Sequence, residues 1–211
     1  MWLPAASKQA WKADLRRCEM GTTQTAVRYT PEDLLAMADG HCYDLVHGQL
    51  IERHMGAESS RIAQLINQRI GLFADAHHLG LVWGPDCGYQ IFADDPNKVR
   101  YPDGSFMARG RLPDNHPPRG HLRIPADLMI EVVSPHDLAW EIDQKVDEFL
   151  RAGVRLVWVL YPDTCTILVY HPGSEVTRLS KSDDLSGENV LPGFTCPVSE
   201  LFPTRTVSTD V

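Results

Sequence analysis

Two charged residues lie where a folded chain rarely leaves charge unpaired. Glu131 lies in the run Leu128–Val133, which is otherwise apolar and therefore typical of a strand buried on both faces of a sheet. Lys145 lies on the apolar face of the helix expected next, one heptad after Leu138. Leaving a buried carboxylate without a partner is costly, so Glu131 needs a cation, a hydrogen-bond donor or a metal beside it.

Asp103 is the third residue with a potential role in chemistry. It lies in Arg-Tyr-Pro-Asp-Gly-Ser-Phe, on a strand expected to leave a hairpin. Two carboxylates on neighbouring strands at one end of a sheet form the hard-oxygen site that Mg²⁺ prefers, completed by water and phosphate oxygens. Such an ion polarises a phosphoryl oxygen and activates water, while a lysine ammonium stabilises the developing charge. Asp103, Glu131 and Lys145 together therefore supply the parts for phosphodiester hydrolysis.

Each of these residues also has a purely structural explanation. Asp103 is explained equally well as a turn aspartate, and Glu131 as one half of a buried ion pair with an arginine. Lys145 has the alternatives of pointing outward or of pairing with Glu141 and Glu148 at helical spacing. The residue types and their spacing alone do not decide between these alternatives.

The elements before Glu131 follow from turn and periodicity signals. We expect a helix that begins at Thr30-Pro31 and ends near Gly40, then a hairpin over 43–52 that turns at His47-Gly48, then a long helix over about 57–78. Strands are expected at 81–83, 88–93 and 99–107, with a turn at 94–97, followed by an irregular loop over 109–124. The long helix is expected to cover a sheet.

The segment around Glu131 predicts a βαβ unit. A strand at 127–133, a helix that ends at Gly153 and a strand at 154–161 should place the two strands parallel. After a turn at Pro162-Asp163 we expect a strand at 166–170 and one or two further short strands. The fold class is therefore α/β, one domain over 29–203 with a mixed sheet flanked by helices. Poorly structured tails are expected at 1–28 and 204–211.

Composition narrows the class of protein. The chain of 211 residues is 43% hydrophobic and has no apolar run of about 18 residues, so we expect a folded core and no membrane span. Five scattered cysteines without a Cys-x-x-Cys pair favour a reducing interior, with neither zinc nor disulfides, and hence the cytoplasm. The histidines show no metal-binding spacing.

Charge gives one local signal for contact with nucleic acid. The net charge of −8 argues against a uniformly basic nucleic-acid binder. Residues 98–123 differ, with Lys98, Arg100, Arg109, Arg111, Arg119 and Arg123 against only Asp103 and Asp114. Arginines on a loop beside the proposed site could clamp phosphates, although a solvated loop explains the same residues equally well.

Several motifs together resemble the Uma-two family of restriction-endonuclease-like proteins, within the PD-(D/E)xK nuclease superfamily. They are Tyr-Pro-Asp103, Pro-Ala-Asp-Leu-Met-Ile-Glu131-Val-Val-Ser-Pro, Lys145, and Gly-Val-Arg-Leu-Val-Trp-Val-Leu-Tyr-Pro. The resemblance covers about residues 29–203 and implies a restriction-endonuclease-like mixed sheet. It also implies that Asp103 and Glu131 hold the metal, and that Lys145 replaces the superfamily lysine, whose usual place is Val133 here.

Other positions fit the resemblance less closely. Asp44 matches an early acidic position that helps to hold the metal in such folds. Judged without the resemblance, Asp44 is better explained as an acidic residue of the hairpin than as a metal ligand. Gly104 stands where a β-branched residue is usual, and Ser59 where relatives tend to carry a histidine. Asp127 opens the central strand, where a capping or turn role is favoured over metal binding.

The implied function is a Mg²⁺-dependent endonuclease, with Mn²⁺ as an alternative ion, that hydrolyses phosphodiester bonds in DNA. We expect no organic cofactor and no membrane partner, and a homodimer would let two sites cut two strands. One alternative is a catalytically inactive nuclease fold that serves as a nucleic-acid-binding or interaction module. Another is a carboxylate-pair hydrolase of a different ester or glycoside, which leaves Lys145 without a task.

Overall fold

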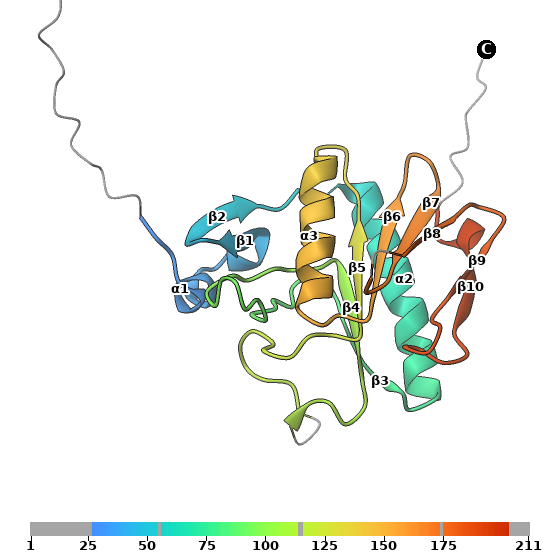
Figure 1. Cartoon of the computed structure of the whole chain (residues 1–211), viewed down its shortest axis with the longest axis horizontal. Coiled ribbons are helices and arrows are strands. Elements are labelled where there is room, and N and C mark those ends of the chain that lie inside the picture. The colour runs from blue at the N-terminus through green and yellow to red at the C-terminus, as the bar shows by residue number, and fades with distance from the viewer. Residues whose placement is uncertain (1–26, 55, 114–115, 174, 203–211) are drawn as a thin grey trace, which may run out of the picture.

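The computed structural model describes residues 27–54, 56–113, 116–173 and 175–202. Six strands form the central sheet: β3 (Gly80–Trp83), β4 (Gly104–Ala108), β5 (Leu128–Val132), β6 (Leu156–Tyr161), β7 (Thr166–Tyr170) and β8 (Val176–Leu179). They are ordered β3-β4-β5-β6-β7-β8, with β5 and β6 parallel and the other neighbours antiparallel (Figure 1). This confirms the predicted mixed α/β sheet and its parallel pair. The predicted tails lie outside the described residues, apart from Val27 and Arg28.

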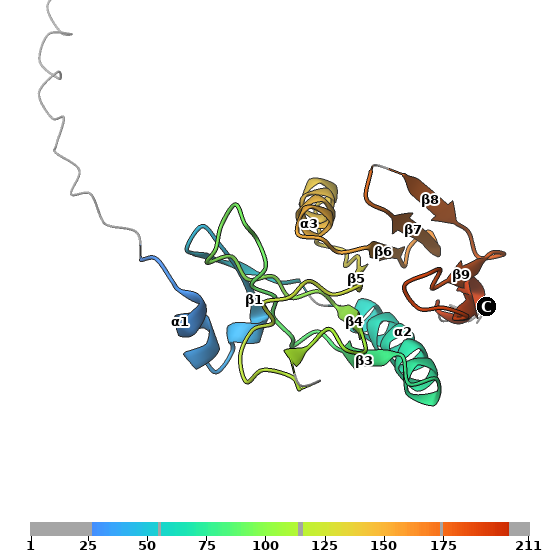
Figure 2. The ribbon, with the colours of Figure 1, turned by 60° about the horizontal axis from the view of Figure 1, so that its bottom comes forward.

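Two helices cover opposite faces of the sheet (Figure 2). On one face, α2 (Ala57–Ala76) packs Ile62, Ile66 and Ile70 into a cluster that contains Leu128, Ile130 and Val132 of β5. On the other, α3 (Ala139–Arg151) packs Ile142, Val146 and Phe149 into a cluster that contains Met129. Side chains alternate along a strand, so Glu131 shares the α3 face with Met129. Burial of each large aliphatic side chain contributes about 1.5–3 kcal/mol to this arrangement.

A smaller unit formed by the N-terminal elements lies at one end of the molecule (Figure 1). It contains α1 (Pro31–Ala36), η1 (Gly40–Cys42) and the hairpin of β1 (Tyr43–Val46) and β2 (Gln49–Glu52). Thr30 and Asp33 form a capping box, which confirms the predicted helix start. His47 and Gly48 both have positive φ, as the predicted two-residue hairpin turn requires.

The hairpin is attached to the rest of the domain by backbone pairing. Leu45 and Val99 exchange two hydrogen bonds, of 2.8 and 2.9 Å. Leu45 and Val99 also share a core cluster with Leu34 and Tyr101. The pairing places Asp44, the residue before Leu45, beside the segment that contains Arg100.

Two predicted strands differ in the structure. Residues 88–93 form no strand, and Tyr89 makes only isolated bridges to Arg100 and Leu122. The strand predicted at 99–107 begins only at Gly104, as β4, because Pro102 has no amide hydrogen and because the amide of Val132 bonds the side chain of Asp103 instead of a backbone carbonyl group.

The ends of two other predicted segments also differ. Three short strands, not one or two, follow β7, and the last two, β9 (Asp184–Ser186) and β10 (Thr195–Pro197), form a separate pair before η3 (Val198–Glu200). Leu138, predicted on the apolar face of the helix, is its N-cap and is 51% exposed. None of the helices in the described part of the chain is both long and apolar enough to cross a membrane.

Gly104, the departure from the usual β-branched residue, is explained by a close approach of α2. Asn67 donates a hydrogen bond of 2.8 Å from its side-chain amide to the carbonyl oxygen of Asp103. A Cβ placed on Gly104 would overlap that amide. A side chain at position 104 is therefore incompatible with the contact that fixes the backbone of Asp103.

Replacing Gly104 with alanine should destabilise the fold by about 1–3 kcal/mol, because the added methyl group must displace Asn67. The loss should be smaller when Asn67→Ala is already present. Gly71→Ala is the matched control, since Gly71 lies in α2 with no neighbour within 4 Å of an added Cβ. That control should gain about 0.4–1 kcal/mol. Urea unfolding of the four variants and of the wild type measures these differences, and equal losses for Gly104→Ala in both backgrounds would contradict the proposed overlap.

Candidate functional site

The carboxylates of Asp103 and Glu131 meet at one end of the sheet, as predicted. Asp103 immediately precedes β4, and Glu131 is the penultimate residue of β5. The antiparallel register pairs Gly104 with Ile130, so the next position along places Asp103 beside Glu131. The amide of Val132 donates a hydrogen bond of 2.8 Å to Oδ2 of Asp103, which fixes that side chain at the strand end.

Lys145 points inward from α3 and bridges two carboxylates. Its Nζ lies 3.3 Å from Oε2 of Glu131 and 3.5 Å from Oδ2 of Asp44. Lys145 thus comes from the helix that covers the Glu131 face, and Asp44 comes from strand β1. The partner of the buried Glu131 is therefore a lysine, not the arginine considered as an alternative.

A chain of buried ion pairs extends from Asp44 away from Lys145. Arg100 donates to Oδ2 of Asp44 at 3.0 Å through Nη1 and to Oε2 of Glu148 at 2.9 Å through Nε. Lys98 donates to Oε1 of Glu148 at 3.0 Å. Glu148 is thus held by Arg100 and Lys98, which contradicts its alternative role as a surface partner of Lys145. The amide of Tyr101 completes the contacts of Asp44 with a hydrogen bond of 3.0 Å to Oδ1.

Arg53 was not identified from the sequence, yet it lies against the site. It donates hydrogen bonds to the carbonyl oxygens of His41 and Pro85, and its Nη2 lies 3.4 Å from Oδ1 of Asp103. Its guanidinium also lies 5.5 Å from the centre of the Tyr101 ring. In the sequence, Arg53 is marked only by its place directly after the hairpin. Arginines are too common at such places to indicate a functional site.

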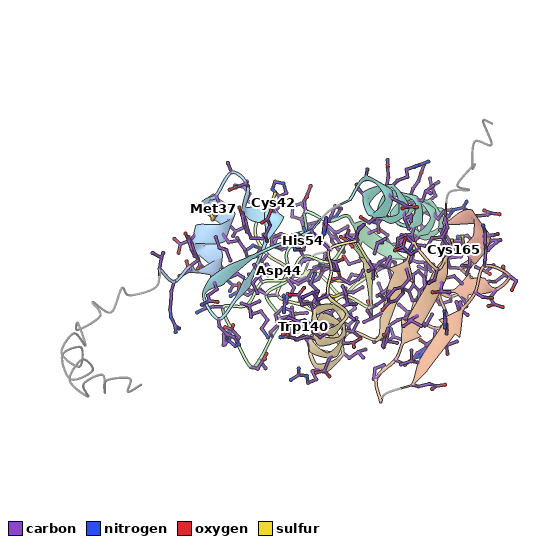
Figure 3. The ribbon with its side chains drawn as sticks, turned by 90° about the horizontal axis from the view of Figure 1, so that it is seen from above. Met37, Cys42, Asp44, His54, Trp140 and Cys165 are labelled. Atoms are coloured by element: carbon purple, nitrogen blue, oxygen red, sulfur yellow. The ribbon has the colours of Figure 1, made fainter. Side chains whose placement is uncertain are left out.

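Most of these charged groups line one cleft. Its wall includes six carboxylate side chains, from Asp44, Glu52, Asp103, Glu131, Asp137 and Glu141, and three permanent cations, from Arg53, Arg100 and Lys145. The cleft has a volume of about 100 Å³, enough for several water molecules. Figure 3 shows Asp44, His54 and Trp140, three residues of this lining, around the space between the hairpin and α3.

Burial and neighbouring charges set the protonation states in the cleft. Burial raises the pKa of Glu131 to about 7, because Lys145 offsets the lost hydration only in part and Asp103 and Asp44 add negative charge. Burial likewise raises the pKa of Asp103. For Asp44, burial is outweighed by Lys145, Arg100 and Arg53, so its pKa lies below the ordinary value.

The ammonium of Lys145 behaves in the opposite way to an isolated buried lysine. Burial alone would lower its pKa, but the carboxylates of Asp44, Glu131 and Asp103 more than compensate and raise that pKa above the ordinary value. Lys145 therefore stays protonated at neutral pH. It is a fixed positive charge and not a base.

The donor set can accommodate a divalent cation. Oε1 of Glu131 is buried and has no hydrogen-bond partner, although a carboxylate oxygen in such a place needs one. Asp103 lies beside it, and the cleft lining has more negative than positive side chains. Within the described ranges, no three His, Cys, Asp or Glu side chains gather as a complete metal cluster. One or two carboxylates completed by water and phosphate are what Mg²⁺ accepts.

Asp44 shares this cleft, but its oxygens already contact Tyr101, Arg100 and Lys145. Its role as a metal ligand therefore stays a prediction. These contacts show what Asp44 does in the fold: it holds the ammonium of Lys145 and the guanidinium of Arg100 in place.

Other charged residues singled out in the sequence lie elsewhere or serve the fold. Asp127 is buried at the opposite end of β5, where it accepts a hydrogen bond from the amide of Ala108 and pairs with Arg111 and Arg155. In the basic window, Lys98 and Arg100 are buried in the ion pairs described above. These two residues of the basic window are therefore not available as phosphate clamps, and a clamping role for the loop arginines at 109–123 stays a prediction.

Ser59 occupies the third position of α2. Its Oγ accepts a hydrogen bond of 3.1 Å from the amide of Gly56 and lies 2.7 Å from Oγ of Ser134, on the loop after β5. The serine therefore ties the start of α2 to the strand that carries Glu131. This contact gives a structural reason for the residue that stands in place of the expected histidine.

The comparisons with known proteins agree with this architecture. The family model Uma2, described as "Putative restriction endonuclease", matches residues 31–199. A crystal structure described as that of "a putative nuclease belonging to DUF820 from Anabaena variabilis ATCC 29413" superposes with a TM-score of 0.69. It is 18% identical in sequence, and the match covers 82% of this chain and 97% of that one. The comparison with curated proteins gave no match.

The raised pKa of Glu131 predicts a pH-dependent contribution to stability. The ordinary pKa is 4.5 and the folded-state pKa about 7, so the folded protein binds this proton more tightly than the unfolded chain. The contribution is fully present below pH 4.5 and is lost as the pH rises through about 7. Glu131→Gln cannot titrate, so between pH 5 and pH 8 its unfolding free energy should rise relative to wild type by about 2–3 kcal/mol.

Urea unfolding in EDTA at several pH values measures this trend. Asp33→Asn is the matched control, because Asp33 lies in the first turn of α1, outside the cleft, and its hydrogen bonds with Thr30 lower its pKa, which places its own stability change below pH 3.8. Its difference from wild type should stay constant between pH 5 and pH 8. A constant difference for Glu131→Gln over the same range would contradict the raised pKa of Glu131.

Proposed function

The chain belongs to the Uma2 family, whose members are described as "Putative restriction endonuclease", and from this premise we propose that it is a divalent-metal-dependent endonuclease that cuts DNA. The observation that carries the proposal is the juxtaposition of Asp103, Glu131 and Lys145 in one cleft, with one oxygen of Glu131 lacking any hydrogen-bond partner. Mg²⁺ is the ion that suits this donor set best, and Mn²⁺ would occupy the same position.

The carboxylates of Asp103 and Glu131 would hold the cation. Such an ion, when bound, supplies polarisation of a phosphoryl oxygen and acidification of a water molecule. Glu131 has a pKa of about 7 in the metal-free cleft, so binding of a cation would favour its ionised form and release a proton below that pH. Asp103 is oriented for this task by the hydrogen bond from the amide of Val132.

Lys145 and Arg53 would stabilise the negative charge that develops on the phosphate. Neighbouring carboxylates raise the pKa of Lys145, so its ammonium is charged in the metal-free cleft, which suits electrostatic stabilisation of the phosphate. Arg53 is held rigidly by two backbone carbonyl groups beside Asp103. Asp44 would act as a positioning residue because it contacts the ammonium of Lys145, and Arg100 and Glu148 would act indirectly by holding Asp44.

One observation favours a second candidate function, a catalytically inactive nuclease fold that binds nucleic acid or a protein. Arg53 contacts Asp103 and Lys145 contacts Glu131, so both acids already have a positive partner without a metal. A site of this kind is stable as a set of buried ion pairs. Binding of DNA by wild type without metal-dependent cleavage would favour this second function.

Glu131→Gln and Asp103→Asn should each reduce DNA cleavage in Mg²⁺ by at least about 10²-fold, because each removes one charged group that acts on the reacting phosphate. EDTA should abolish cleavage by the wild type. The circular dichroism spectrum and the urea midpoint show whether each variant stays folded. Asp163→Asn is the matched control, since Asp163 also follows a proline but lies in the turn before β7, outside the cleft. Cleavage by Glu131→Gln at the wild-type rate would contradict the assignment.

A further inference from the structure

A large apolar side chain stands at the mouth of the cleft without a role in the chemistry proposed above. Trp140, in the first turn of α3, lines the same cleft as Asp103 and Glu131, yet it is 61% exposed. Ile51 of strand β2 also lines the cleft and is 42% exposed. A tryptophan this exposed is unusual, since burial of its ring would gain considerable free energy. Figure 3 labels Trp140 on α3, near Asp44 and His54, which line the same cleft.

The reacting groups lie deeper than Trp140. Glu131 is 3% exposed, and the side chains of Asp103 and Lys145 are 17% and 16% exposed. A phosphate must therefore enter the cleft to reach them. Paired DNA is stiff, with a persistence length of about 150 base pairs, so bringing one phosphate inward requires bending or opening the helix. A single strand meets no such cost.

Charge supplies little affinity for a phosphate backbone here. The cleft has six carboxylates against three cations, and two residues of the expected basic window, Lys98 and Arg100, are buried in ion pairs. Binding of double-stranded DNA relies largely on lysine and arginine contacts to phosphates. Proteins that bind single strands add stacking of bases on aromatic rings, which tolerates any sequence. The exposed ring of Trp140 offers such a contact.

A second groove continues from the cleft along α2 and suits the same kind of ligand. It has a volume of about 430 Å³ and shares His54 and Asp103 with the cleft. Ser60, Gln64 and Gln68 line it at one-turn spacing. Uncharged amide and hydroxyl groups of this kind hydrogen-bond base edges and sugars. Such contacts require bases that are not hidden in a duplex.

From these observations we propose that Trp140 is a stacking platform for an unpaired base beside the scissile phosphate, and that the substrate is DNA that is single-stranded or locally unpaired at the cut. The proposal rests on the proposed function of the cleft as a nuclease site. Ile51, on the β2 side, extends the apolar surface for the base. The phosphate next to that base then reaches Asp103, Glu131 and Lys145 without distortion of a duplex.

The test compares three DNA substrates of one sequence with the full-length protein in Mg²⁺. They are a single strand, a fully paired duplex, and a duplex with a central bubble of unpaired bases. The wild type should cut the single strand and the bubble at least about tenfold faster than the paired duplex, as measured by kcat/KM. Binding of the same substrates is measured separately by fluorescence anisotropy. These measurements use the Glu131→Gln variant, because it should bind DNA without cutting it.

The variants are Trp140→Ala and Trp140→Phe, each made alone and in the Glu131→Gln background. Loss of the ring should weaken single-strand binding and raise KM by about tenfold, whereas phenylalanine, which still stacks, should stay within about threefold of wild type. Leu72→Ala is the matched control, because Leu72 is 66% exposed on α2 and lines neither the cleft nor the groove. Trp140 is exposed, so its loss should leave the urea midpoint unchanged.

The outcomes separate this proposal from the proposed function. Metal-dependent cleavage that is equal for paired and unpaired DNA, and equal for Trp140→Ala and Leu72→Ala, would overturn the stacking proposal and leave the nuclease intact. Single-strand binding that depends on Trp140, without cleavage by wild type, would support the subsite and reject the nuclease. The wild type could instead sediment as a dimer and Trp140→Ala as a monomer, with no change in DNA binding. That result would show that Trp140 and Ile51 contact a second copy of the chain, and it would overturn the proposal.

Discussion

The ammonium group of Lys145, placed between the carboxylates of Glu131 and Asp44, is the contact on which the rest of the site depends. A buried carboxylate near the end of a central strand would be too costly without it. Asp44 in turn is held by Arg100, and Arg100 by Glu148, which lies three residues after Lys145 on the same helix face. Helix α3 thus donates one cation and one anion to a chain of charges. That chain ties the hairpin, the sheet and the helix together, so the position of the site and the packing of these elements are set by the same contacts.

The sequence was sufficient for the parts of the fold that depend on local patterns. The apolar run around Glu131, the glycine at 153 and the apolar strand after it predicted the parallel βαβ unit, and Thr30-Pro31 predicted the first helix start. The placement of Lys145 on an otherwise apolar helix face predicted that it points inward. The three residues that emerged from this reasoning do line one cleft in the structure. The match of the family model over residues 31–199 confirms the resemblance that those motifs suggested.

The remaining features depend on contacts between residues far apart in sequence. Arg53 and Asp103 are separated by 50 positions, and Arg100 and Glu148 by 48, so no local pattern marks them as partners. Arg100 and Lys98 were counted in a basic window because their buried acceptors, Asp44 and Glu148, could not be identified from the sequence. The strand expected at 99–107 begins only at Gly104 for a related reason, since the Asp103 side chain takes the amide of Val132 that a continuous ladder would have used. Charged side chains thus replace regular backbone pairing at the edge where the site is formed.

The central claim is that Asp103 and Glu131 hold a divalent cation beside a permanently charged Lys145. Diffraction from crystals grown with Mn²⁺, recorded at a wavelength where manganese scatters anomalously, tests it most directly. The account predicts an anomalous peak next to both carboxylates, on the side of the Glu131 oxygen that has no hydrogen-bond donor. Crystals at saturating Mn²⁺ that show no peak there, with Lys145 and Arg53 still paired to the two acids, would contradict it.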